Sequence, residues 1–114
     1  MSGKVFKYQD LVADATQYRT IIKTDKYSQK TIMYIEPGKC VGREIHHNAD
    51  QTVIILQGNG FAMLSPPDNP DKIDVIEFHT HDMIDVPAGI YHDFYNYDPD
   101  CGLKLLVVYS PPIH

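Results

Sequence analysis

Hydrophobic and polar residues alternate along most of the chain with a period of two, the pattern of strands that bury one face. These runs are rich in Val, Ile, Tyr, Phe and Thr, and turn-forming residues such as Pro37-Gly38 and Gly58-Asn59 separate them. The pattern predicts strands at residues 18–24, 29–35, 41–47, 51–57, 60–64, 73–78, 83–86, 92–97 and 103–109.

Residues 8–15 form the one segment whose pattern suits a helix, with Asp10 as its candidate cap and little length to propagate. Residues 65–71 contain three prolines and predict a surface loop, because proline cannot continue a strand ladder. No internal repeat or linker divides the chain, so we expect a single domain over residues 1–114. The expected class is all-β: an antiparallel jelly-roll barrel with a short N-terminal helix.

Composition supports this class. Ile, Val, Tyr, Thr and Phe number 38, whereas Ala, Leu and Met number 15, so strand formers dominate the apolar helix formers. The net charge of −5 argues against nucleic-acid and anionic-membrane partners. The N-terminus lacks the apolar centre of a signal peptide, and two cysteines are too few for a disulfide scaffold. We therefore expect a cytoplasmic protein with both thiols reduced.

Two segments carry candidate metal ligands. In the strand expected at 41–47, Glu44 and His46 point to one face and His47 to the other. In the next strand, Gln51, Val53 and Ile55 share a face.

Later in the chain, His92, Phe94 and Asn96 share a face after the Pro87-Ala88-Gly89 turn. If these strands line one interior, a carboxylate, two imidazoles and an amide converge there, and a divalent metal is their natural partner. Phe94, Val53 and Ile55 would then wall a substrate pocket.

The spacing of these residues resembles the paired motifs of the cupin superfamily. The first motif, usually Gly-x5-His-x-His-x3-4-Glu-x6-Gly, stands here as Gly38-x5-Glu44-x-His46-x4-Gln51-x6-Gly58. The second stands as Pro87-x-Gly89-x2-His92-x3-Asn96, with His81 in place of the glycine that usually opens it. Other segments, including the Tyr109-Ser110-Pro111-Pro112 ending, resemble a group of small single-domain cupins described as mannose-6-phosphate isomerase-like.

The resemblance implies one divalent ion per chain, Fe, Mn, Ni or Zn, held by Glu44, His46, His92 and Gln51. Glu44 stands where the family usually has histidine, and Gln51 where it usually has glutamate. Gln51 either coordinates through its oxygen or only forms a hydrogen bond near the metal. His79 and His81 are expected at a turn and are not expected to bind the metal.

Three functions remain open from the sequence. The first is a metal-dependent enzyme acting on a small oxygen-rich molecule, with Glu44 as a catalytic group and isomerase, lyase or Fe(II) dioxygenase chemistry. The second is a non-catalytic small-molecule-binding cupin, and the third is a barrel whose polar interior binds no metal. By resemblance we expect a homodimer.

Overall fold

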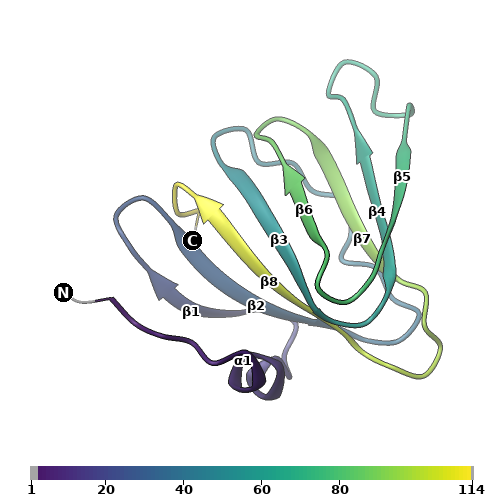
Figure 1. Cartoon of the computed structure of the whole chain (residues 1–114). Helices are drawn as coiled ribbons and strands as arrows, with labels where there is room; N and C mark the ends of the chain where they lie inside the picture. Colours follow the sequence, from purple (N-terminus) through teal and green to yellow (C-terminus); the bar gives the residue numbers. More distant parts are fainter. Residues whose placement is uncertain (1–2, 114) are drawn as a thin grey trace.

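The computed structural model describes residues 3–113, which form two antiparallel sheets and one short helix (Figure 1). The larger sheet has the order β1-β2-β8-β3-β6 and the smaller one β5-β4-β7. The bounds are α1 Tyr8–Asp14, β1 Thr20–Thr24, β2 Gln29–Ile35, β3 Asp50–Gln57, β4 Gly60–Ser65, β5 Asp74–Phe78, β6 Met83–Val86, β7 Tyr91–Asn96 and β8 Leu103–Ser110. The expected all-β jelly roll with a short N-terminal helix is confirmed.

The main core lies between the two sheets, and alternation along the strands fills it. Strand β8 shows this most clearly, because Leu103, Leu105, Val107 and Tyr109 are all buried while the residues between them are half-buried. Phe78 and Phe94 of the smaller sheet join the same cluster, with ring centroids 6.4 Å apart. Burying such side chains, at about 1.5–3 kcal/mol each, holds the two sheets face to face.

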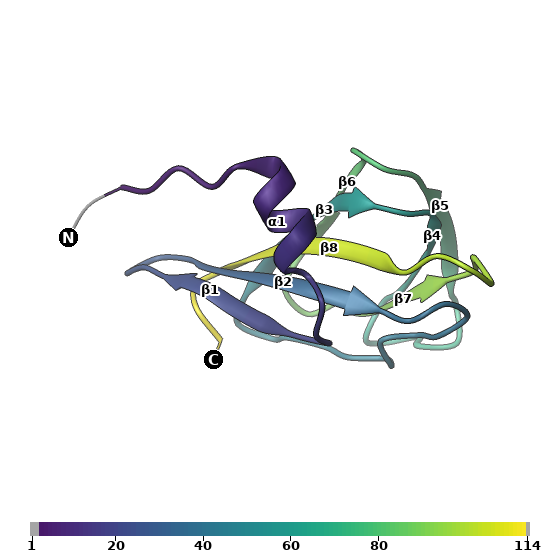
Figure 2. The same cartoon turned by 90° about the horizontal axis from the view of Figure 1, so that it is seen from below.

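Helix α1 packs on the outer face of the larger sheet (Figure 2). Leu11 and Ala15 contact Ile32 of β2 and Leu56 of β3 there, in a second small core. The expected helix is confirmed, but Asp10 does not cap it. Asp10 lies in the first turn, and Lys7 occupies the N-cap position without a side-chain cap bond. No helix within residues 3–113 is long and apolar enough to cross a membrane.

The strand expected at residues 41–47 is wrong. This stretch meets β7 only through two isolated bridges, Cys40 with Tyr95 and Glu44 with His92. Gly42 lies between them with φ of +101°, and its N–H donates to the Asp93 carboxylate at 2.9 Å. Because that left-handed backbone interrupts the extended conformation, no continuous ladder forms.

Candidate metal centre

The predicted ligands come together because three segments meet at one place between the sheets. Glu44 and His92 are direct partners: the N–H of each donates to the carbonyl of the other at 2.9 Å. Strand β3 brings Gln51 to the same place, opposite Val86 of β6 and Tyr109 of β8.

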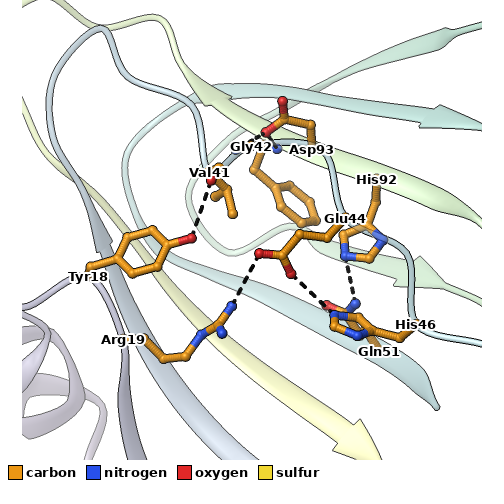
Figure 3. A network of polar contacts seen from close by, with 10 residues as sticks. Tyr18, Arg19, Val41, Gly42, Glu44, His46, Gln51, His92 and Asp93 are labelled. Carbon is orange, nitrogen blue, oxygen red and sulfur yellow. Dashed lines mark hydrogen bonds and ion pairs between the residues drawn. The ribbon is translucent and has the colours of Figure 1, made fainter. Parts of the chain in front are cut away.

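Glu44, His46 and His92 each offer a ligand atom, and these atoms lie within 4.8 Å of one another. His46 Nε2 is 3.3 Å from Glu44 Oε2, and the two imidazole centroids are 5.2 Å apart (Figure 3). His92 is buried, whereas Glu44 and His46 are half-buried. The cluster therefore has an enclosed side and a side nearer solvent.

The hydrogen bonds of His92 define its tautomer. Its Nδ1 lies 3.1 Å from the Ile90 carbonyl, which can only accept, so Nδ1 carries the proton. That leaves Nε2 as an acceptor, and the Gln51 amide nitrogen lies 2.8 Å from it. A half-turn of the amide exchanges its oxygen and nitrogen, so Gln51 can present either atom to this point.

The burial and the pKa of His46 suit a metal ligand. Its Nε2 is buried and makes no hydrogen bond of good geometry among the described residues, although Glu44 Oε2 lies 3.3 Å from it. Burial, followed by the charge of the nearby His92, lowers the pKa of His46 below the usual value, although Glu44 acts in the opposite direction. A neutral imidazole is the form that binds metals. Two imidazoles and a carboxylate, gathered at one place, therefore fit a divalent ion.

Sequence reasoning missed Arg19. Its Nη2 lies 3.8 Å from Glu44 Oε1, so the two oxygens of Glu44 face different partners, Arg19 and His46 (Figure 3). Arg19 directly precedes β1, and no motif marks it. The contact depends on β1 lying at the edge of the larger sheet beside the 40–47 segment, which alternation along one strand does not reveal.

Two tyrosines near the cluster were also missed. The ring of Tyr109 packs edge-on against His46 at 5.6 Å, and burial raises the pKa of Tyr109. The Tyr18 hydroxyl donates to the Val41 carbonyl at 3.3 Å, and burial, followed by the charge of Glu44, raises its pKa. The Tyr109-Ser110-Pro111-Pro112 ending was the one sequence signal for either of them.

The residues expected to wall a substrate pocket lie in the main core. Val53 and Ile55 are fully buried there, and Phe94 lies between the cluster and the core, 6.2 Å from the His92 ring. His46 itself lines a hollow of about 390 Å³, together with Pro111, Pro112 and other residues of the 45–49 and 111–113 segments. The pocket role of Val53, Ile55 and Phe94 stays a prediction.

The other three histidines that the structure describes lie outside the cluster. His47, His79 and His81 are exposed. His79 Nδ1 lies 2.8 Å from the Asn59 side-chain oxygen, and the ring of His81 packs on Tyr8. His81 has φ of +77°, the left-handed conformation for which the usual glycine of the motif is suited.

The chain is similar to two curated proteins. It is 35% identical over 99 residues to the uncharacterized protein YrkC of Bacillus subtilis (strain 168), covering 85% of this chain and 51% of YrkC. It is 34% identical over 98 residues to the uncharacterized protein L612 of Acanthamoeba polyphaga mimivirus, covering 85% of this chain and 58% of L612. The chain thus spans little more than half the length of these relatives. No family model matches the chain.

Solved structures define the class of the fold. BH2720 from Bacillus halodurans superposes with a TM-score of 0.91 at 28% identity, covering 99% of this chain and 84% of that chain. The cupin domain of Schizosaccharomyces pombe Cnp3 gives 0.71 at 12% identity, covering 82% and 60%. A predicted oxalate decarboxylase from Thermotoga maritima gives 0.64 at 21%, covering 76% and 69%. The chain has the double-stranded β-helix fold of the cupins, and its three-ligand cluster lies between the sheets of that fold.

Proposed function

We propose that this chain is a metal-dependent cupin enzyme that acts on a small oxygen-rich molecule. The observation that carries the proposal is the cluster of Glu44, His46 and His92, whose ligand atoms lie within 4.8 Å of one another, with His46 Nε2 buried 3.3 Å from Glu44 Oε2. Two imidazoles and one carboxylate leave further coordination positions open, as in the non-haem Fe(II) set. One Fe, Mn, Ni or Zn ion per chain suits these ligands.

The metal would supply Lewis-acid polarisation of substrate oxygens. The chain's own residues hold and orient the reacting groups. The Ile90 carbonyl fixes the tautomer of His92, and Gln51 lies against its Nε2 as a direct ligand or a hydrogen-bond partner. Glu44 is positioned to exchange a proton with a bound substrate, because it is the one carboxylate of the cluster and remains half-buried.

The reaction class is proposed on resemblance. The motifs resemble those of mannose-6-phosphate isomerase-like cupins, which favours isomerisation of a hydroxy-carbonyl compound. The predicted oxalate decarboxylase among the structural neighbours supports lyase chemistry as well. Dioxygenation at Fe(II) would use the same three ligands.

A non-catalytic small-molecule-binding cupin is the second candidate. Gln51, an amide, stands where the motif usually carries a carboxylate, and the remaining carboxylate, Glu44, already faces Arg19 and His46. Because Glu44 is the one carboxylate of the cluster and already interacts with two side chains, the site favours ligand binding over proton transfer.

Turnover by the metal-loaded protein distinguishes the two candidates. Wild-type protein would be loaded in turn with Fe(II), Mn(II), Ni(II) and Zn(II) and incubated with a panel of hydroxy-carbonyl compounds and small acids, followed by NMR. An enzyme converts a panel member with at least one metal, and the His46→Ala/His92→Ala variant does not. Saturable binding without turnover would establish the second candidate, and equal turnover by the variant would overturn the first.

Two further expectations belong to this proposal. Cys40 and Cys101 are free and exposed thiols, which supports a reducing compartment such as the cytoplasm. The homodimer implied by the resemblance is tested by sedimentation equilibrium, in which a mass near 13.0 kDa would contradict it.

A further inference from the structure

Arg19 contacts the candidate metal centre from outside the predicted ligand set. Its side chain is 23% exposed, and its Nη2 lies 3.8 Å from Glu44 Oε1. That distance is too long for a hydrogen bond, so the guanidinium and the carboxylate form an ion pair without a direct hydrogen bond between these two atoms. A cation at this distance does not serve metal binding, because it repels a dication and competes for Glu44.

The charges around the cluster require a negative partner once a metal is bound. Glu44 and Arg19 offset one another, and ligating imidazoles are neutral, so a dication would leave a net positive charge even with the nearby Asp93 carboxylate counted. Asp93, the other carboxylate drawn in Figure 3, accepts N–H groups from Gly42 at 2.9 Å and Phe94 at 2.8 Å. In a half-buried site such an excess is costly, and an anionic ligand offsets it.

The arrangement favours a carboxylate over a phosphate. A planar guanidinium suits both anions, but phosphate sites usually add several backbone N–H donors from a helix N-terminus or a glycine-rich loop. Within residues 3–113 the one helix, α1, packs on the outer face of the larger sheet. A carboxylate with a neighbouring hydroxyl or carbonyl oxygen needs one guanidinium and open metal positions, which this cluster offers.

Tyr18 lies beside the Arg19 guanidinium. On the same side of Glu44, the Tyr18 hydroxyl is bonded to the Val41 carbonyl, which joins the start of β1 to the 40–44 segment (Figure 3). The Arg19 guanidinium lies 5.6 Å from the Tyr18 ring centroid. Tyr18 thus helps to position the guanidinium near Glu44.

From this arrangement we propose that the site binds small 2-hydroxy or 2-oxo carboxylates, with Arg19 as the residue that recognises the carboxylate. The proposal rests on the metal-dependent function proposed above and names its substrate class. Arg19 turns from Glu44 toward the carboxylate of the ligand, and the neighbouring oxygen is left for the metal.

Calorimetry on Ni(II)-loaded protein tests this with glycolate and its neutral amide, glycolamide, which have the same size and the same hydroxyl. We expect wild type to bind glycolate at least about tenfold more tightly than glycolamide. Arg19→Gln reduces this preference by at least about tenfold, leaving only the part due to the metal, and Arg19→Lys retains more of it. Arg43→Gln is the matched control, because Arg43 stacks on Tyr91 in an exposed position and should leave the preference intact.

Bound Ni(II), measured on each sample, separates this inference from the function on which it rests. A wild type that binds no metal overturns both. A wild type that binds metal but shows no preference for glycolate overturns the inference alone, as does an Arg19→Gln variant whose preference equals that of wild type. Tighter binding of methyl phosphate than of glycolate overturns the carboxylate assignment. If circular dichroism shows that Arg19→Gln is misfolded, the wild-type ligand comparison and Arg19→Lys decide.

Discussion

Glu44 is the residue at which this site differs most from the motif it resembles, since it places a carboxylate where a histidine is usual. Its two oxygens face Arg19 and His46, and its backbone pairs with His92. Gln51 is the second difference from the cupin motif, because an amide stands there in place of the usual glutamate. The single negative charge of the ligand set therefore depends on Glu44.

Replacing Glu44 by Gln should weaken binding of Mn(II) and Fe(II) by at least about tenfold, because hard ions favour charged oxygen ligands. Gln51→Glu should strengthen binding by adding a second carboxylate. Equilibrium dialysis with each ion measures both effects. Wild-type occupancy in Glu44→Gln would show that Glu44 is not a ligand.

Substituting Ala for His92 should abolish metal binding, whereas the same change at His81 should leave it nearly intact. His92 is buried with Nε2 facing the cluster, while His81 is exposed at the turn before β6. Metal content after equal loading compares the two variants. Equal losses would mean that the wrong histidines have been chosen.

The metal-free protein should lose stability as the pH falls below about 6.5, partly because of His46. Burial lowers the pKa of His46 in the folded state, so the unfolded chain takes up this proton first and unfolding is favoured as the pH falls. Thermal melts between pH 7.5 and 5.5 should show a smaller fall for His46→Gln than for wild type. His47→Gln, at an exposed neighbour, should follow the wild type; identical curves for all three proteins would contradict the role of His46.

At the scale of elements, Asn96 fixes the end of β7 and with it the strand that carries His92. Its side chain is fully buried, and its Nδ2 donates to the carbonyls of Cys101 at 2.8 Å, Ile35 at 3.1 Å and Glu36 at 3.3 Å. Its Oδ1 accepts the Asp98 N–H at 3.0 Å. The place of Asn96 in the motif therefore has a structural reason.

Asn96→Ala should lower the free energy of unfolding by about 2–4 kcal/mol, since it leaves buried carbonyls without donors. Asn69→Ala, at an exposed loop position, is the control and should change it by less than about 0.5 kcal/mol. Chemical denaturation measures both variants. A loss below about 1 kcal/mol at Asn96 would contradict its bracing role.

The strands were largely predictable from the sequence. Alternation identified every strand that joins a ladder, because burial of one face imposes a period of two. It failed at residues 41–47, where Gly42 adopts φ of +101°, the extended conformation is interrupted and only isolated bridges form. Motif spacing predicted that Glu44, His46 and His92 converge, but Arg19 contributes through a contact between distant segments that no local pattern records.

In the whole molecule, two sheets hold the candidate metal-binding cluster between them while a hydrophobic core maintains their spacing. The helix packs on the outer face of the larger sheet, so it leaves the interior to the ligands (Figure 2). The −5 charge of the chain attracts cations in general, but the site itself pairs its carboxylate with Arg19. The central claim is that one metal ion occupies this interior cluster.

Anomalous diffraction from crystals of metal-loaded wild-type protein, recorded at the absorption edge of the bound metal, tests that claim most directly. The account predicts one peak per chain, within about 2.0–2.3 Å of a Glu44 carboxylate oxygen, His46 Nε2 and His92 Nε2. The absence of a peak there, or a peak at His79 and His81 instead, would contradict it.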